Sequence, residues 1–122
     1  MVYPETNVFI VDNSNVKEVR CVHVYNQSSN NFGSTGSFII GVITKLKKNN
    51  LKSTQKRGDL VKVLIVFTRK EKNNIKGSGI FVKAPKNFGI LFDKKIAVGS
   101  RCKGVLPIKI KPLVPSLLNF FI

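Results

Sequence analysis

The chain has no tryptophan, a single histidine and only six acidic residues among its 122 positions. The acids are scattered, and no two stand close enough to suggest a general acid and base that act together. His23 lies within an apolar run, where a lone histidine is usually structural. A nucleophilic pair of Cys102 and His23 stays open, but no motif supports it. Gly77-Ser78-Gly79 lacks the strand–loop–helix context of a phosphate-binding loop and is interpreted as a hairpin turn. The sequence therefore predicts a protein that is not an enzyme and has no cofactor.

Cysteine is also scarce, since Cys21 and Cys102 are the only two, and neither stands in a CxxC or CxxH spacing. No zinc or redox motif follows, and we expect no bound metal. The number of cysteines permits one disulfide, but two isolated buried thiols are the preferred interpretation.

Long apolar runs and N-terminal targeting signals are missing as well. Positions 1–12 contain acids and no basic residue, which favours neither a signal peptide nor a transit peptide. The longest apolar stretches are far shorter than a membrane span. The apolar run Pro112–Ile122 is interrupted by Pro115, and we expect it to pack on protein. Contact of this run with a membrane surface is a weaker alternative.

Positive charge is what the chain has in excess. Twenty-one lysines and arginines against six acids give a net charge of +15, although 43% of the residues are hydrophobic. A basic tail would lack the apolar residues to fold, and self-repulsion would destabilise an ordinary domain of this size. We therefore expect a compact domain whose partner is a polyanion that supplies the missing countercharge.

The apolar runs are short, rich in β-branched residues and bounded by Gly, Asn, Asp or Lys, which is typical of an all-β protein. A hairpin is expected between Ile80–Lys83 and Phe88–Phe92, around the turn at 84–87. The other predicted strands are Asn7–Val11, Glu18–Tyr25, Phe38–Leu46, Leu60–Arg69, Ile96–Val98 and Val105–Ile110.

The strand predicted over Leu60–Arg69 has the clearest pattern. Its first face is marked by Val61, Val63, Ile65 and Phe67. Leu64 and Val66 lie on the opposite face, so the pattern predicts burial on both sides of the strand.

Helix signals are poor, and at most a turn or two fits Pro115–Phe121. Five to seven short strands with tight turns favour a small closed β-barrel, because closure removes exposed sheet edges. With neither an internal repeat nor a linker, the whole chain, 1–122, is expected to form one domain.

The basic residues fall into three clusters that we interpret as phosphate-binding surface. The first, in a connecting loop, consists of Lys45, Lys47, Lys48, Lys52, Lys56 and Arg57. The second, after the clearest strand, consists of Arg69, Lys70, Lys72 and Lys76. The third consists of Arg101, Lys103, Lys109 and Lys111. A solvated charged surface would explain any one of these lysines, but not three clusters with so few acids between them.

The aromatic residues do not indicate base stacking. A reader of single strands would place aromatic rings on an exposed sheet face beside basic residues. Four phenylalanines instead lie within apolar runs and are expected in the core: Phe38, Phe67, Phe88 and Phe92. Phe32, in a polar loop, is the exception. We therefore expect contact with phosphate and sugar, and recognition of folded RNA by its shape.

The order of several motifs resembles that of ribosomal protein fourteen of the large subunit. The motifs are Val11-Asp12-Asn13-Ser14, Val19-Arg20-Cys21-Val22, the run from Gly58-Asp59-Leu60 to Thr68-Arg69-Lys70, Gly77-Ser78-Gly79-Ile80, Asn87-Phe88-Gly89-Ile90-Leu91 and Val98-Gly99-Ser100-Arg101. The resemblance extends from about Val8 to Gly104, and the tail from Pro107 departs from it most.

This resemblance implies a five-stranded β-barrel with a protruding β-ribbon and a short, irregular or helical C-terminal segment at about 105–122. It implies binding to large-subunit rRNA and packing against a neighbouring ribosomal protein, which is protein nineteen in bacterial-type ribosomes. It also implies a place at the subunit interface, where members of the family help to bridge to small-subunit rRNA. A ribosome-silencing factor can dock on members of this family.

The functional hypothesis is therefore a structural protein of the large subunit. Contact with on the order of eight phosphates would make its binding fall steeply with salt. Residues predicted to bind rRNA are Lys45, Lys47, Lys48, Lys52, Lys56, Arg57, Arg69, Lys70 and Lys72. From their position in the Gly-Ser-Arg turn, Arg101 and Lys103 are predicted to face the subunit interface.

A free-standing OB-like RNA-binding factor is the alternative to this hypothesis, and a cationic protein of the membrane surface is a third, weaker one. The abundance of lysine and asparagine is typical of an A/T-rich genome. That bias favours an organelle ribosome, with the mitochondrion first and a plastid or a bacterium as alternatives.

Overall fold

The computed structural model describes residues 2–25, 33, 35–47, 56–69, 73–74, 81–82, 86–93, 96–99, 102, 106 and 108–114, to which all structural statements refer. Its strands are β1 (Asn7–Ile10), β2 (Val16–Val24), β3 (Phe38–Leu46), β4 (Leu60–Phe67), β5 (Asn73–Asn74), β6 (Phe81–Val82), β7 (Phe88–Asp93) and β8 (Ile96–Ala97). A 3-10 helix, η1, follows at Ile108–Leu113. No helix in this described part is long and apolar enough to cross a membrane.

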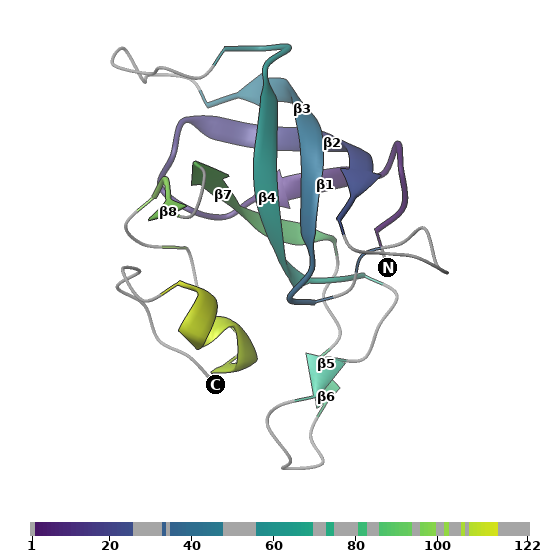
Figure 1. Ribbon diagram of the computed structural model, residues 1–122, viewed down its shortest axis with the longest axis vertical. Helices are drawn as coiled ribbons and strands as arrows, with labels where there is room; N and C mark the ends of the chain where they lie inside the picture. Colours follow the sequence, from purple (N-terminus) through teal and green to yellow (C-terminus); the bar gives the residue numbers. More distant parts are fainter. Residues whose placement is uncertain are drawn as a thin grey trace.

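Five of the strands form a closed barrel (Figure 1). β1, β2, β3, β4 and β7 pair in that order, each antiparallel to the next. The barrel closes where β1 pairs with β7 in parallel, with Phe9 opposite Phe88 and Ile10 opposite Gly89. β8 extends the sheet beyond β7 as a short antiparallel strand. The prediction of an all-β, five-stranded barrel is confirmed.

The seam between β1 and β7 depends on the absence of a side chain at Gly89. A Cβ there would lie 2.5 Å from Val63 Cγ1, 3.0 Å from Val8 Cγ1 and 3.1 Å from the Leu64 carbonyl oxygen. These distances are shorter than carbon contacts in packed cores allow. β7 can therefore fit between β4 and β1 only with glycine at this position.

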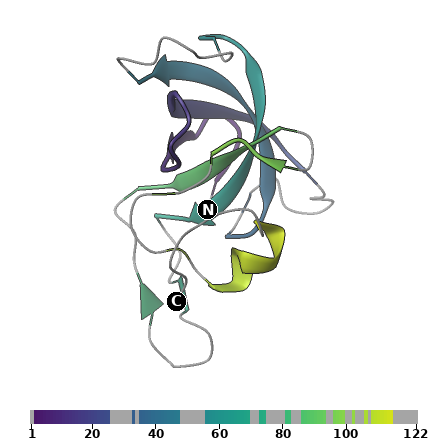
Figure 2. The ribbon, with the colours of Figure 1, turned by 90° about the vertical axis from the view of Figure 1, so that its left-hand side faces the viewer.

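Two apolar cores lie on opposite faces of β4. The first fills the barrel and includes Val8, Val19, Ile43, Val63 and Ile65. The second lies outside the barrel, where Leu64, Val66, Ile90 and Phe92 are covered by Cys102, Leu106, Ile110 and Val114 of the C-terminal segment. Figure 2 shows η1 beside the barrel. The predicted burial of both faces of β4 is thus confirmed.

Phe67 corrects one detail of the predicted pattern. It was expected on the same face as Val63 and Ile65, but it packs against the outer core. The pairing of β4 with β7 shifts register between Ile65 and Phe67. Such a bulge inserts one residue and turns the following side chain to the other face. Phe38 and Phe88 are partly buried and Phe92 is buried, all at the outer core, as predicted.

The hairpin predicted between Ile80–Lys83 and Phe88–Phe92 is wrong. Phe81 and Val82 form β6, which pairs with β5 as a separate two-stranded ribbon. β7 already has β4 along one edge and β1 and β8 along the other, so it has no edge left for β6. The ribbon protrudes from the barrel in both views (Figures 1 and 2), in agreement with the architecture that the resemblance implied.

The strand predicted over Val105–Ile110 is also wrong, because η1 begins at Ile108. The buried residues here are Leu106, Ile110 and Val114, which stand four positions apart. That spacing follows the period of a helix and not the alternation of a strand. The helical turns predicted at Pro115–Phe121 lie outside the described residues, as does the turn at 77–79.

Asp12 connects several elements at the end of β1. It is 2% exposed. Its Oδ1 accepts hydrogen bonds from the backbone N–H and the hydroxyl of Ser14, and its Oδ2 accepts one from the Leu91 N–H of β7 at 3.1 Å. Its carbonyl oxygen accepts from Lys47 Nζ at 2.6 Å, and its backbone pairs with Cys102. One buried carboxylate therefore joins the turn after β1 to the middle of β7.

We expect Asp12→Asn to lower the free energy of unfolding by about 1.5–3 kcal/mol. An amide has only one acceptor atom, so it cannot serve both Ser14 and Leu91. Urea denaturation followed by circular dichroism measures the change.

Asp93→Asn is the matched control, because it removes the same charge from an exposed residue at the end of β7. It should change the free energy of unfolding by less than about 0.5 kcal/mol. Equal effects of the two substitutions would contradict the role given to Asp12.

Candidate nucleic-acid interface

A basic groove lies where β2, β3 and the turn before β4 meet. It is lined by Lys17 of β2, by Thr44, Lys45 and Leu46 of β3, and by Arg57 of the turn, and it encloses about 400 Å³. Lys17, Lys45 and Arg57 are exposed. We call these five residues the basic groove.

The turn that carries Arg57 is held firmly against β3. Gly58 donates its N–H to the Ile43 carbonyl at 2.9 Å, and Ile43 donates its N–H to the Asp59 carbonyl at 3.0 Å. Asp59 also accepts the Lys56 N–H through Oδ2 at 2.9 Å. Gly58 has φ of +94°, a conformation that favours glycine. These bonds hold the Arg57 backbone beside the strand that bears Lys45.

Lys45 is the one lysine of the basic groove with an acidic neighbour in the described part of the chain. Its Nζ lies 3.6 Å from Oε2 of Glu18, whose side chain is 9% exposed while that of Lys45 is 62% exposed. The two residues are cross-strand partners of β2 and β3. Lys17 and Arg57 have no such partner among the described residues, so the groove keeps a net positive charge.

Three other predicted contact residues occupy different places. Lys47 Nζ donates to the Asp12 carbonyl oxygen, so this ammonium already serves the fold. Arg69 is exposed just after β4, where its backbone N–H donates to Asn87 Oδ1 at 2.8 Å. Lys56 is exposed at the turn beside Arg57. An RNA contact by any of them stays a prediction.

The remaining residues predicted for RNA or interface contact lie outside the described residues. They are Lys48, Lys52, Lys70, Lys72, Arg101 and Lys103.

Sequence reasoning missed a cation that strand pairing brings to this surface. Lys17 was not assigned to any cluster, because it stands apart from the other basic residues of the groove along the chain. The antiparallel pairing of Val16 with Leu46 places Lys17 next to the Lys45 region. Strict alternation would place Lys17 on the face of the buried Val19 and Cys21. The register of β2 and β3 shifts between Glu18 and Val19, and only this pairing shows that Lys17 is exposed and what it faces.

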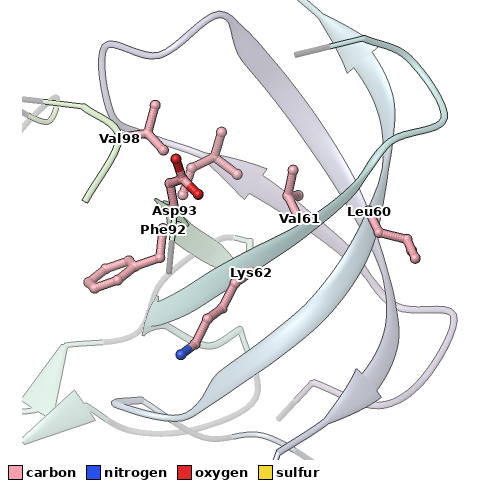
Figure 3. Close-up of a pocket in the computed structure, with 7 residues that line it drawn as sticks. Leu60, Val61, Lys62, Phe92, Asp93 and Val98 are labelled. Atoms are coloured by element: carbon pink, nitrogen blue, oxygen red, sulfur yellow. The ribbon is translucent and has the colours of Figure 1, made fainter. Parts of the chain in front are cut away.

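A second hollow of about 260 Å³ lies at the start of β4 (Figure 3). It is lined by Leu60, Val61, Lys62, Leu91, Phe92, Asp93 and Val98. Its volume is below the range of about 300–1,000 Å³ that is usual for small-molecule sites. Among its described lining residues Asp93 is the only carboxylate, so these residues offer no pair of carboxylates for acid–base catalysis.

The two cysteines are free and buried, as predicted. Burial raises the pKa of the Cys21 thiol to about 11. Burial, and then the nearby negative charge of Asp12, raise the pKa of Cys102 to about 12, while Lys47 acts in the opposite direction. Both thiols are therefore protonated at neutral pH, whereas a cysteine nucleophile needs a lowered pKa.

These raised pKa values predict a dependence of stability on alkaline pH. An unfolded thiol ionises near pH 9, but the folded thiols resist ionisation until about pH 11 to 12. Their contribution to the free energy of unfolding is therefore complete below pH 9 and is lost as the pH rises above it. We expect urea denaturation to show this loss as the pH rises from about 9 to about 11 in the native chain.

The control is a Cys21→Ala, Cys102→Ala double variant, which keeps all the lysines that also titrate at alkaline pH. The difference in free energy of unfolding between the native chain and this variant should shrink as the pH rises. A difference that is constant over the same range would contradict the raised pKa values.

One comparison with known proteins bears on the identity of the chain. The model of the family described as Ribosomal protein L14p/L23e matches residues 1–113. The match includes the whole barrel, the ribbon and η1, and it confirms the resemblance found in the sequence motifs. The family is structural and not enzymatic. Because the match extends over nearly the whole length of the chain, the chain belongs to the L14p/L23e family of ribosomal proteins of the large subunit.

Proposed function

We propose that this chain is a structural constituent of the large ribosomal subunit and binds large-subunit rRNA through the basic groove. The observation that carries the proposal is the convergence of Lys17, Lys45 and Arg57 from three segments onto one open concavity. Only one of these three cations, Lys45, has a carboxylate partner in the described part of the chain. Such a site favours a chain of phosphates over a neutral ligand.

Each residue type of the groove suits a part of an RNA backbone. Arg57 can bind two oxygens of one phosphate through its planar guanidinium, and the lysines act as flexible point charges. The Thr44 hydroxyl already donates to the Glu18 carbonyl at 3.2 Å, so it contributes to the wall of the groove. Leu46 supplies apolar surface against which a ribose can pack. None of these contacts reads a base, so binding would follow the shape of the RNA.

The net charge of +15 supports the same assignment. Like charges on so small a barrel repel one another, and a polyanion relieves this repulsion when it binds. The remaining predicted cations would extend the contact beyond the groove, from Lys56 and Arg69 to Lys48, Lys52, Lys70 and Lys72. These residues are proposed from charge and position.

Further partners are proposed from the family. They are a neighbouring ribosomal protein equivalent to protein nineteen, small-subunit rRNA across the interface, and a ribosome-silencing factor. Arg101 and Lys103 are proposed for the interface-facing edge, because of their position in the Gly-Ser-Arg turn. The abundance of lysine and asparagine supports an organelle ribosome, with the mitochondrion favoured.

Salt dependence of rRNA binding tests the proposal. Contact with about eight phosphates should reduce the affinity for large-subunit rRNA by about 10³- to 10⁵-fold between 50 and 200 mM salt. Filter binding with the purified chain and the rRNA measures this slope. An affinity that hardly changes with salt would sink the proposal.

A pair of substitutions locates the contact. Lys17→Gln should reduce the slope of log K against log salt by about 1, because one phosphate contact is lost. Lys86→Gln removes the same charge from a lysine whose Nζ lies 4.4 Å from the centre of the Phe9 ring, outside the basic groove. It should change the slope less. A larger reduction of the slope by Lys86→Gln than by Lys17→Gln would place the RNA elsewhere on the barrel.

A further inference from the structure

The outer face of β2, β3 and β4 carries two rows of side chains that continue across the strands. In one row His23 pairs with Ile40, and Ile40 pairs with Lys62. In the next row Arg20 pairs with Val42, and Val42 pairs with Leu60. Residues directly opposite in an antiparallel pair project to the same side of the sheet. Each row therefore has an apolar centre and a basic residue at one end or both ends. We call these six residues and Tyr25 the outer platform.

Much of the outer platform is open to solvent. Leu60 is 67% exposed, and Val22, next to His23, is 50% exposed. Ile40 and Val42 are half-buried. Further along β4, the outer core begins with Leu64. The C-terminal cover that buries Leu64 does not bury Leu60.

Aromatic rings and a lysine meet at one end of this face. The rings of His23 and Tyr25 are arranged edge to face, with centroids 6.1 Å apart. Lys62 Nζ lies 5.6 Å from the centroid of Tyr25 and 4.5 Å from that of Phe38. Figure 3 shows Lys62 leaving β4 on the side opposite to Val61, which packs against the barrel core. His23 is exposed and Tyr25 is half-buried.

The charges around the outer platform favour an anionic partner. Arg20 and Lys62 border it. Of the described acids nearby, Glu18 is buried beside Lys45, and Asp59 accepts the Lys56 N–H. Glu5 is exposed, and its backbone N–H donates to the Cys21 carbonyl of β2 at 2.7 Å. Asp93 belongs to the hollow that Lys62 also lines. An apolar, aromatic centre with a basic border matches the surfaces on which unpaired nucleotides stack.

We propose that the outer platform binds an unpaired nucleotide of the large-subunit rRNA. The base stacks against the ring pair of His23 and Tyr25, and its sugar packs over Ile40 and Val42. Arg20 and Lys62 bind the phosphates on either side. The proposal rests on the rRNA binding proposed above and adds to it a second mode of contact. It also departs from the expectation that aromatic residues other than Phe32 do not stack on bases.

Pairing between strands explains why the sequence did not indicate this site. Tyr25 and Lys62 stand 37 positions apart and belong to different segments. The rings of the platform are a histidine and a tyrosine, whereas phenylalanines dominate the aromatic content of the chain. Four of these phenylalanines pack on the outer core: Phe38, Phe67, Phe88 and Phe92.

Tyrosine fluorescence gives a direct test, because the chain has no tryptophan and only two tyrosines. Tyr3→Phe leaves Tyr25 as the only tyrosine and does not change a residue of the platform. Titration of this variant with large-subunit rRNA should quench the emission of Tyr25 in parallel with binding.

Substitutions of Tyr25 in the full chain give the second readout. Tyr25→Leu keeps the apolar volume but removes the ring, and should weaken rRNA binding by about 5- to 150-fold, the effect of losing one stacked base. The slope of log K against log salt should not change, since no phosphate contact is lost. Tyr25→Phe keeps the ring and should bind like the native chain.

These experiments distinguish failure of the stacking proposal from failure of rRNA binding itself. Steep, salt-dependent binding with unchanged Tyr25 emission, and with native affinity for Tyr25→Leu, would overturn the platform and leave the basic groove intact. Absence of rRNA binding by the native chain would overturn both proposals. If Tyr25→Leu binds naked rRNA normally but is lost from assembled large subunits, the face docks a protein and the stacking proposal is wrong.

Discussion

The buried carboxylate of Asp12 is the interaction on which the arrangement of this barrel depends. β1 ends at Ile10, so it is too short to pair with the whole length of β7. Val11 donates the last backbone bond of the seam, to Gly89. Beyond it, Asp12 Oδ2 accepts the N–H of Leu91, where a longer β1 would have offered a backbone carbonyl. The carbonyl oxygen of Leu91 accepts the N–H of Val98. Beyond Leu91, the same edge of β7 therefore pairs with β8. One side chain thus joins barrel closure to the C-terminal part.

Closure of the barrel also determines where the charge can go. The interior admits apolar side chains and glycine, and the outer core occupies one flank of β4 and β7. The described lysines and arginines therefore lie on the remaining outer face of the barrel, in the basic groove and in the connecting segments. In a barrel of this size with a net charge of +15, burial of the apolar core must outweigh the repulsion between the surface cations. This balance explains why a polyanionic partner is expected to stabilise it.

The sequence predicted what depends on local pattern and missed what depends on pairing. β3 was predicted with its observed ends, Phe38–Leu46, because apolar residues continue between clear turn signals. β6 was paired with the wrong strand, since proximity along the chain does not show that both edges of β7 are occupied. The basic groove was half predicted: Lys45 and Arg57 share a cluster, but Lys17 joins them only through the register of β2 and β3. Tyr25 was missed for the same reason.

Sedimentation of a native lysate through a sucrose gradient tests the central claim most directly. A structural protein of the large subunit should travel with that subunit and with joined ribosomes, and should stay on the particle through a high-salt wash, because many contacts must break together. Detection of the chain at moderate and then at high salt distinguishes a structural constituent of the large subunit from a free RNA-binding factor. If it remains at the top of the gradient, or leaves the particle at modest salt, the chain acts as a free RNA-binding factor and is not a structural constituent of the large subunit.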